Sequence, residues 1–457
     1  MIRLFNHYLS VRTLLLAAIE AMVLFQSVVL VFQLRVADFS LRLPVAEAGV
    51  FTSVMLLMMT ALGLYQAQAE PFRVTVQRVL VAYGLSLVLM SFFFYVFPSF
   101  YVGRGAFLVS SLFAMAGVMV VRLVFFRMTD IGLPRRRVLV LGNGPEAEEI
   151  IRYLHEGELV RAVQYAGMYP VVAERETGEP ERRINHDQLM RTVRDLRVSE
   201  IVIAVRDRRG GVLPLRQLLD ARLTGVRVMD LAAFYERERG MLKVDNLRAS
   251  WLIFGQGFDQ GMTRDVVKRL FDVVVSLVML VLTLPILLVT MLLIVLETGF
   301  PVFYRQERVG QAGVPFTIYK LRSMRQDAEK DGRPQWATTG DNRCTRVGRF
   351  IRLTRIDELP QLFNVLRGDM SFVGPRPERP FFVQQLITDI PYYDIRHSVK
   401  PGVTGWSQVR YPYGASVEDS LAKLQYDLYY VKNHSLFLDL LILVETAQVV
   451  LLGKGAR

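Results

Sequence analysis

Long apolar runs dominate the first part of the chain, and few charged residues interrupt them. Each run has about the 20 residues that an α-helix needs to cross a ~30 Å hydrocarbon core. We therefore predict a membrane protein with four N-terminal transmembrane helices within residues 1–130, and a soluble bundle of buried helices is the alternative. The four runs are Leu14 to Leu34, Gly49 to Tyr65, Val74 to Phe97 and Ala106 to Phe126.

Arginine residues flank the four runs unevenly. Because positive charges are retained on the cytoplasmic side of inserted helices, this bias places both ends of the region in the cytoplasm. Arg122 lies inside the fourth run, near its end, and is expected to snorkel to the same side. The arginines predicted to be cytoplasmic are Arg3, Arg12, Arg73, Arg78, Arg127, Arg135, Arg136 and Arg137, and those on the opposite side are Arg35, Arg42 and Arg104.

Beyond Arg137 the apolar runs shorten to strand length and alternate with helical stretches. This alternation predicts an open, Rossmann-like α/β domain over residues 135–240. Gly142, Gly144 and Ala147 nearly complete a dinucleotide fingerprint, but the second strand lacks the acidic residue that would bind a ribose hydroxyl. A regulatory or assembly role is therefore preferred, with NAD binding as the alternative. The predicted strands are Val138 to Leu141, Val163 to Tyr169, Ile201 to Val205 and Val226 to Met229.

A fifth apolar segment, Asp265 to Glu297, follows a stretch expected to be a linker over residues 241–264. The segment is long enough to cross the bilayer once. Pro285 lies in its middle, where it removes a backbone N–H and clashes with the preceding turn, so the helix is expected to bend sharply. A bent helix can enter and leave the membrane by the same face. A proline-kinked spanning helix is the alternative.

Composition agrees with a membrane location. The chain is 52% hydrophobic and carries a formal charge of +12, which suits nucleic acid, an anionic membrane surface or anionic substrates. Apolar runs bounded by arginine favour the membrane, so no nucleic-acid partner is expected. Cys344 is the one cysteine, which excludes an intramolecular disulfide and a cysteine-based zinc cluster.

The stretch from Thr345 to Glu378 combines two adjacent carboxylates, Asp357 and Glu358, with many arginines and a Gly-Pro-Arg-Pro turn. Arginine binds phosphate oxygens bidentately, and a carboxylate pair can hold Mg²⁺ or attack phosphorus. The alternative is a basic amphipathic helix whose acidic pair only balances its arginines. The arginines of this stretch include Arg346, Arg349, Arg352, Arg355, Arg367 and Arg376.

Five short motifs in the C-terminal part occur together in one order. Together they resemble the catalytic signature of the large bacterial polyprenyl-phosphate hexose-1-phosphate transferases, which are membrane-bound phosphoglycosyl transferases. The motifs are Tyr304-Arg305-Gln306-Glu307-Arg308-Val309-Gly310, Tyr319-Lys320-Leu321-Arg322-Ser323-Met324, Asp357-Glu358-Leu359-Pro360-Gln361, Asn364-Val365-Leu366-Arg367-Gly368-Asp369-Met370-Ser371 and Val373-Gly374-Pro375-Arg376-Pro377-Glu378.

The resemblance implies an α+β catalytic domain over residues 265–457, with a re-entrant membrane helix at 265–297. The implied reaction moves hexose-1-phosphate from a UDP-sugar to undecaprenyl phosphate, giving polyprenyl-diphosphate-sugar and UMP, and it initiates exopolysaccharide or other surface glycan synthesis. Mg²⁺ is the implied cofactor. The implied location is the bacterial inner membrane, with the soluble domains in the cytoplasm. Glucose or galactose is the expected sugar, and a homodimer stays open.

The resemblance also assigns roles to residues. Asp357 would be the nucleophile that forms a covalent phosphosugar, and Glu358 would help it to hold Mg²⁺ or position the incoming phosphate. Neighbouring side chains on a helix diverge by ~100°, so a shared metal requires this pair at a helix end or kink, which Pro360 would favour. The substrate-binding residues on this interpretation are Lys320, Arg322, Arg352, Arg355, Pro375, Arg376 and Pro377, and Pro285 is structural.

Two other function classes compete with this interpretation. A membrane-anchored nucleotide-sugar dehydratase or epimerase would need a complete dinucleotide fingerprint and usually a Tyr-x-x-x-Lys pair, and the sequence contains no such pair. A non-enzymatic scaffold of polysaccharide assembly gives no reason for the ordered motifs. Release of UMP from a UDP-sugar would separate the three.

Overall fold

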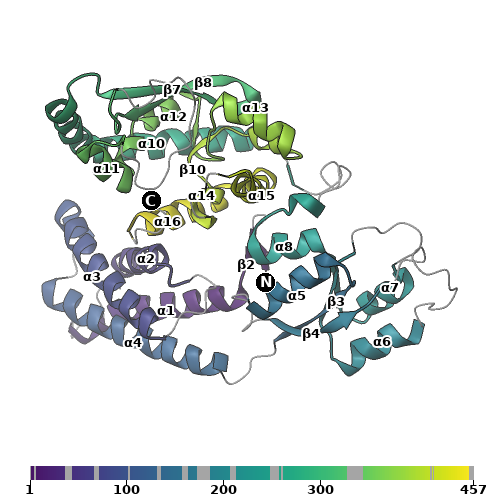
Figure 1. The fold of residues 1–457 in the computed structure, drawn as a ribbon. Coiled ribbons are helices and arrows are strands. Elements are labelled where there is room, and N and C mark those ends of the chain that lie inside the picture. Colours follow the sequence, from purple (N-terminus) through teal and green to yellow (C-terminus); the bar gives the residue numbers. More distant parts are fainter. Residues whose placement is uncertain are drawn as a thin grey trace. The chain divides into compact units, whose positions relative to one another are not determined.

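The structure, a computed structural model, describes residues 2–4, 7–35, 44–65, 72–100, 103–130, 135–156, 163–171, 186–205, 213–246, 257–258, 261–326, 343–411, 414 and 416–451. The chain forms two compact units (Figure 1). The first comprises residues 1–2 and 9–238, and the second comprises residues 3–8 and 239–457.

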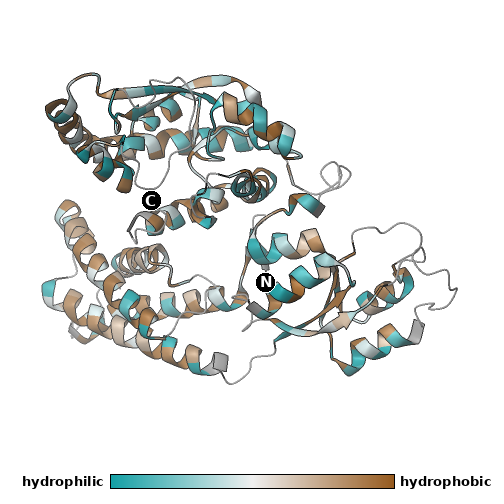
Figure 2. Cartoon of the chain, in the orientation of Figure 1, coloured by the Kyte–Doolittle hydropathy of each residue, from teal (hydrophilic) through white to brown (hydrophobic). Residues whose placement is uncertain are grey.

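Four apolar helices begin the first unit. α1 packs against α2 and α4, and α2 packs against α3. α1, α3 and α4 are long and apolar enough to span a membrane, whereas α2 is a shorter apolar helix (Figure 2). The prediction of a membrane protein with N-terminal spans is therefore confirmed. The elements are α1 (Val11–Arg35), α2 (Val45–Ala61), α3 (Phe72–Val96), the 3-10 turn η1 (Pro98–Phe100) and α4 (Arg104–Asp130), and they follow two short strands, β1 (Ile2–Leu4) and β2 (His7–Leu9), that belong mostly to the second unit.

A buried ion pair joins the first and fourth helices. Arg122 Nε lies 2.7 Å from Glu20 Oε1, and the two side chains are 6% and 0% exposed. The Tyr65 hydroxyl donates to Glu20 Oε2 at 2.5 Å. The expectation that Arg122 snorkels to the membrane surface is wrong, because Glu20 neutralises its charge inside the bundle.

A four-stranded parallel sheet forms the other part of the first unit, with strand order β4-β3-β5-β6. Each strand overlaps a predicted one, which confirms a sheet-containing domain, and the Rossmann-like description stays a prediction. The elements are β3 (Arg136–Leu141), α5 (Pro145–Glu156), β4 (Val163–Tyr169), α6 (His186–Asp195), β5 (Glu200–Ile203), α7 (Leu215–Leu223), β6 (Arg227–Asp230) and α8 (Leu231–Arg239).

The glycine-containing turn after β3 has a packing role. Gly142 has a φ of +141°, and a Cβ there would lie 2.4 Å from the Ala204 carbonyl oxygen. Packing of neighbouring chain segments therefore explains this glycine without a ligand. Glu146 and Glu148 occupy the first turn of α5, where a dinucleotide would place its phosphates. Their charges favour a role other than dinucleotide binding.

The second unit is an α+β assembly of one long helix, small two-stranded sheets and several shorter helices (Figure 1). β7 and β8 form an antiparallel hairpin, and β9 pairs in parallel with β10. The elements are η3 (Val244–Asn246), α10 (Met262–Thr298), β7 (Phe303–Val309), η4 (Gln311–Gly313), β8 (Pro315–Leu321), α11 (Arg346–Leu353), η5 (Ile356–Glu358), α12 (Gln361–Arg367), β9 (Ser371–Val373), α13 (Pro380–Asp389), η6 (Tyr393–Ser398), β10 (Gly402–Thr404), α14 (Trp406–Arg410), α15 (Val417–Asn433) and α16 (Leu436–Leu451).

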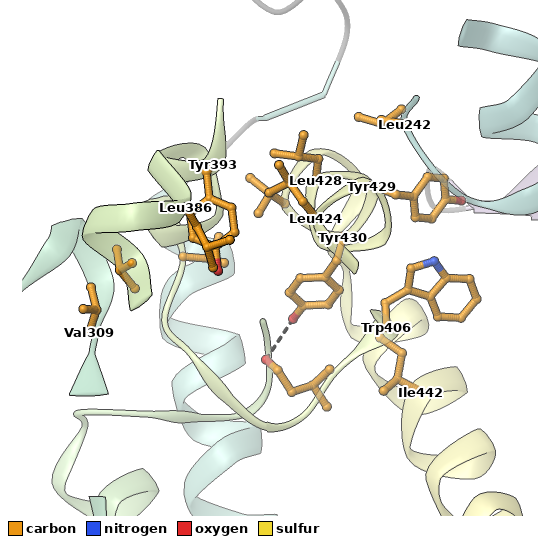
Figure 3. Close-up of a cluster of buried hydrophobic side chains, with 14 of the residues drawn as sticks. Leu242, Val309, Leu386, Tyr393, Trp406, Leu424, Leu428, Tyr429, Tyr430 and Ile442 are labelled. Carbon is orange, nitrogen blue, oxygen red and sulfur yellow. Dashed lines mark hydrogen bonds between the residues drawn. The ribbon is translucent and has the colours of Figure 1, made fainter. Parts of the chain in front are cut away.

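The core of this unit centres on α14, α15 and α16 (Figure 3). Trp406 and Tyr429 are 1% and 0% exposed and stack with their ring centroids 5.9 Å apart. Leu242 and Val244 lie in the stretch expected to be a linker, yet both are buried in this core. The rest of that stretch includes residues outside those described.

The long apolar helix α10 contains Pro285, and its two ends contact the same unit. Near its start, Arg269 donates to the carbonyls of Val365 and Leu366, at 2.5 and 2.7 Å. Near its end, Glu297 accepts hydrogen bonds from the backbone N–H groups of Arg346 and Val347, at 2.7 and 3.0 Å. Both ends of the apolar helix are therefore bonded to one compact domain.

Candidate active site

The Gly-Pro-Arg-Pro turn follows β9 directly and packs tightly against β10. The N–H of Gly374 donates to the Thr404 carbonyl at 2.9 Å, and that of Gly402 donates to the Pro375 carbonyl at 3.0 Å. A Cβ on Gly374 would lie 2.3 Å from the Lys400 carbonyl oxygen, so this approach requires glycine. Pro375 and Pro377 are buried, and Arg376 between them is partly exposed.

The two adjacent carboxylates lie in a single 3-10 turn, η5, between α11 and α12. Arg355 before them has a left-handed backbone, with φ 61°, which ends the path of α11 and redirects the chain. Asp357 and Glu358 are 8% and 7% exposed. The expectation that a helix end near Pro360 would carry the pair agrees with this geometry.

Glu358 is surrounded by positive charge. Its Oε1 lies 2.6 Å from Arg376 Nη2 and 3.1 Å from Lys320 Nζ, and its Oε2 lies 3.9 Å from Arg355 Nη1. Burial alone would raise the pKa of Glu358, but these three cations hold it well below its usual value. Glu358 is therefore an ionised, fixed anchor for the basic residues of the site.

Asp357 is in the opposite electrostatic situation. Its Oδ1 is buried and has no hydrogen-bond partner in the described part of the chain. Burial, and then the neighbouring charge of Glu358, raise the pKa of Asp357 to about 6. A buried polar atom without a partner is unfavourable unless a ligand satisfies it, so Asp357 is the member of the pair prepared to bind or react.

The residues fit a Mg²⁺ ion that takes most of its ligands from a substrate. No group of three His, Cys, Asp or Glu side chains able to hold a metal occurs within the described ranges. Mg²⁺ is commonly held by one or two carboxylates together with substrate phosphates and water. The partnerless Oδ1 of Asp357 suits such an ion, whereas both oxygens of Glu358 already face cations.

Lys320 lies on β8 of the β7–β8 hairpin, and Asn364 forms hydrogen bonds with the backbone of that hairpin. Asn364 Nδ2 donates to the Thr317 carbonyl at 2.7 Å, and its Oδ1 accepts from the Tyr319 N–H at 3.1 Å. Asn364 is fully buried. It belongs to one of the sequence motifs but was not assigned a role there, and the structure shows that it anchors the strand carrying Lys320.

Two of the predicted substrate-binding arginines make their polar contacts elsewhere. Arg322 Nη2 donates to Thr298 Oγ1 at 2.6 Å and to the Gly299 carbonyl at 2.5 Å, at the end of α10. Arg352 Nη1 lies 2.8 Å from Cys344 Sγ. The structure thus brings together Asp357, Glu358, Lys320, Arg355 and Arg376, and a substrate role for Arg322 and Arg352 stays a prediction.

Two further residues that sequence reasoning missed support the arginine turn. Arg396 donates to the Arg376 carbonyl at 2.9 Å while its guanidinium binds Asp427 Oδ2 at 2.8 Å. Arg396 and Asp427 are 5% and 1% exposed. Neither lies in a recognisable motif. Asp427 lies among mostly aromatic and apolar residues, where a buried charge requires a partner, whereas the residues around Arg396 are polar and give no such signal.

Comparison with known proteins places this region in a family. Residues 263–453 match the model of the bacterial sugar transferase family. A UDP-N-acetylgalactosamine-undecaprenyl-phosphate N-acetylgalactosaminephosphotransferase of Aeromonas hydrophila is 43% identical over 242 residues, which are 53% of this chain and 56% of that protein. The chain therefore spans little more than half the length of this relative.

Two further relatives are UDP-glucose:undecaprenyl-phosphate glucose-1-phosphate transferases. The protein of Xanthomonas campestris pv. campestris is 34% identical, with 71% of this chain and 68% of the relative covered. The protein of Caulobacter vibrioides is 43% identical, with 42% of this chain and 72% of the relative covered. With the motifs, the paired carboxylates and these matches, the chain belongs to the bacterial sugar transferase family.

Proposed function

We propose that the protein transfers hexose-1-phosphate from a UDP-sugar to undecaprenyl phosphate. The observation that carries this proposal is the contrast between the paired carboxylates. Glu358 is fixed by Arg376, Lys320 and Arg355, while Asp357 keeps a buried oxygen without a partner. The names of relatives as undecaprenyl-phosphate sugar phosphotransferases support the same reaction class.

The first half-reaction forms a covalent intermediate on Asp357. Its ionised carboxylate attacks the sugar-bearing phosphorus of the UDP-sugar, an O–P bond forms, and the bond from that phosphorus to the bridging oxygen breaks. The electron pair leaves with UMP. Arg376, partly exposed beside Glu358, is placed to neutralise charge on the leaving phosphate. Bound Mg²⁺ would supply further neutralisation of the diphosphate charge, with Asp357 as its protein ligand.

The second half-reaction returns the carboxylate to its starting state. A phosphate oxygen of undecaprenyl phosphate attacks the same phosphorus, the acyl phosphate bond breaks, and polyprenyl-diphosphate-sugar is released. Lys320 and Arg355 remain beside Glu358 throughout and keep the site positive for either anionic substrate. Because the sugar phosphate stays on the carboxylate between the two steps, the protein does not need to bind the water-soluble donor and the lipid acceptor at the same time.

We further propose that α10 is re-entrant, and contacts at its two ends support this. Arg269 and Glu297 lie on either side of the apolar stretch, yet both bond to the short region between residues 346 and 366. A helix that crossed the ~30 Å hydrocarbon core would leave these ends on opposite sides of the bilayer. One compact domain cannot bind both unless the helix returns to the side it came from.

This topology puts the transferase domain on the cytoplasmic face of the bacterial inner membrane, where UDP-sugars are available, and suits a role at the start of exopolysaccharide or other surface glycan synthesis. The names of relatives do not agree on the sugar, since they include N-acetylgalactosamine, glucose and galactose transferases. N-acetylgalactosamine therefore joins glucose and galactose as a candidate.

The test is UMP release by the purified full chain in detergent or nanodiscs. UDP-glucose, UDP-galactose and UDP-N-acetylgalactosamine are each supplied with Mg²⁺, with and without undecaprenyl phosphate. We expect one donor to give continuous UMP release that requires the lipid, together with a sugar-bearing diphosphate lipid. A protein that releases no UMP with any UDP-sugar would contradict the proposal and favour a scaffold or a different nucleotide-sugar enzyme.

A further inference from the structure

The strand that precedes the arginine turn is bonded to the long membrane helix. β10 covers one edge of β9, and on the other edge the N–H of Phe372 donates to Asp272 Oδ1 of α10 at 3.1 Å. Lys268, one turn earlier on α10, lies 3.2 Å from the same carboxylate oxygen. A side chain of α10 thus satisfies a backbone donor that a third strand would otherwise satisfy.

Several side-chain donors lie within hydrogen-bonding distance of the carbonyl of Val373, at the end of this strand. The Tyr430 hydroxyl lies 3.0 Å from it, as the dashed line in Figure 3 shows, and Ser371 Oγ lies 2.9 Å from it. Lys268 Nζ is farther away, at 3.4 Å. A carbonyl oxygen has two lone pairs, and Tyr430 and Ser371 are the nearest donors to it.

The group of Lys268, Asp272, Tyr430 and Asp439 forms one buried network. Asp272, Tyr430 and Asp439 are each 1–2% exposed. The single proton of the Tyr430 hydroxyl is shared between the Val373 carbonyl and Asp439 Oδ1, which lies 2.7 Å from the hydroxyl, and Asp439 Oδ2 lies 2.9 Å from Lys268 Nζ. Burial and the charge of Asp439 raise the pKa of Tyr430 well above its usual value, so the hydroxyl keeps its proton. A satisfied network of this kind holds its members rigidly.

We propose that this network is a positioning device for Arg376, so that the first half of the membrane helix sets the geometry of the transferase site. This inference rests on the proposed function. Val373 is followed directly by the Gly-Pro-Arg-Pro turn, whose arginine reaches Glu358 at 2.6 Å. A charged group that stabilises a transition state must be held to within about 0.5 Å, so loosening the strand should lower kcat more than it raises KM.

Two adjacent tyrosines of α15 offer a matched pair of variants. Tyr430→Phe removes the hydroxyl that contacts both the Val373 carbonyl and Asp439, and it keeps the ring in the core. Tyr429→Phe removes a hydroxyl that is equally buried but bonds to His7 Nδ1, at 2.7 Å. We expect Tyr430→Phe to lower kcat for UMP release about tenfold, from the loss of hydrogen bonds at a buried site, with less than a twofold change in KM. Tyr429→Phe should change kcat by less than about twofold. Equal losses in the two variants would overturn the proposal.

A double-mutant cycle separates positioning from a general loss of stability. If Tyr430 acts through Arg376, the Tyr430→Phe substitution should have little further effect on kcat once Arg376 is alanine. Effects that multiply in Tyr430→Phe/Arg376→Ala would show that the two residues act independently, and would also overturn the proposal.

Hydrogen–deuterium exchange provides a readout that does not need catalysis. Amides of residues 371–377 should exchange faster in Tyr430→Phe than in Tyr429→Phe, while residues of α13 should be unchanged. If the wild-type chain releases no UMP, the proposed function fails and this exchange difference still tests the structural part of the inference. If the wild-type chain is active and exchange in residues 371–377 is the same in both variants, only the positioning role fails.

Discussion

Arg376 Nη2 lies 2.6 Å from Glu358 Oε1, while the adjacent Asp357 presents a buried Oδ1 that has no hydrogen-bond partner within the described structure. Two carboxylates that are neighbours in sequence therefore have different electrostatic surroundings. Glu358 contacts the basic residues, and Asp357 is the proposed nucleophile.

Asp357→Asn should abolish turnover, because the amide keeps the side chain's size and lacks the charge and the nucleophile. Wild-type enzyme given UDP-sugar and Mg²⁺ without lipid should release at most about one UMP per active site. Asp357→Asn should release none, and Glu358→Gln should slow the release without abolishing it. Rapid-quench measurement of UMP checks this, with mass spectrometry to locate the adduct. A full lipid-dependent rate without any lipid-independent burst would instead indicate direct transfer with Asp357 as a metal ligand.

Arg376→Ala should lower kcat by about 10²-fold or more, because the lost charge acts on the leaving phosphate, and thermal stability should change little. Arg376→Lys should recover only part of the rate, since a lysine cannot bind phosphate through two parallel hydrogen bonds. Arg367→Ala is the matched control, because the Arg367 side chain is 68% exposed and lies 3.9 Å from Asp369. A folded Arg376→Ala protein with the wild-type rate would remove Arg376 from the mechanism.

Chelation of divalent metal should stop catalysis. Activity is expected to vanish in EDTA and to return with Mg²⁺ or Mn²⁺, because the phosphates of two anionic substrates need neutralisation beyond what the basic residues provide. Ca²⁺, which prefers longer bonds and more ligands, should restore less. Steady-state UMP release in metal-buffered solutions measures this. Full turnover in chelator would exclude a metal from the reaction.

Pro285→Ala should restore a backbone hydrogen bond and favour a straight helix by about 3 kcal/mol. Part of the population should then span the bilayer, so a tag placed after Arg457 becomes accessible to protease added on the periplasmic side. Ile286→Ala, at the next position, is the control and should leave the tag protected. Pro285→Ala with unchanged topology and full activity would show that the proline does not turn the chain.

Glu20→Gln should destabilise the helical bundle by about 3 kcal/mol, because it leaves the Arg122 guanidinium buried without a counter-charge. Denaturant unfolding of the purified chain in detergent measures the effect. Replacing both residues with glutamine should cost less than the sum of the single substitutions, since no unpaired charge remains. Simple additivity would mean that the pair contributes nothing as a pair.

Several features were predictable because they depend on local pattern. Helix length and apolarity marked α1, α3, α4 and α10, and apolar runs of strand length marked β3 to β6. The motif order predicted a site around Asp357 and Glu358, and the structure brings the predicted Arg376 and Lys320 into contact with Glu358. In each case the information lies within a few neighbouring residues.

The missed contacts join residues far apart in the chain. Asp272 accepts a hydrogen bond from the Phe372 N–H, and Arg396 donates one to the Arg376 carbonyl. Neither contact produces a periodic pattern that can be recognised in a single sequence. Arg322 shows a second difficulty. Alternation along a strand places residues 320 and 322 on one face, but β8 ends at Leu321, and Arg322 turns to the end of α10 instead. Motif membership alone does not give the direction of a side chain.

The buried pair in the helical bundle affects how the protein is made. Glu20 leaves the ribosome 102 residues before Arg122. Until α4 emerges, the first span holds a carboxylate without its partner, and a charged residue near the centre of an inserted helix costs about 3 kcal/mol. α1 is therefore less stable in the bilayer until α4 has joined it. A chain that terminates before α4 keeps this unneutralised charge in its first span. The unpaired charge distinguishes unfinished copies from complete ones, so that membrane proteases can remove them.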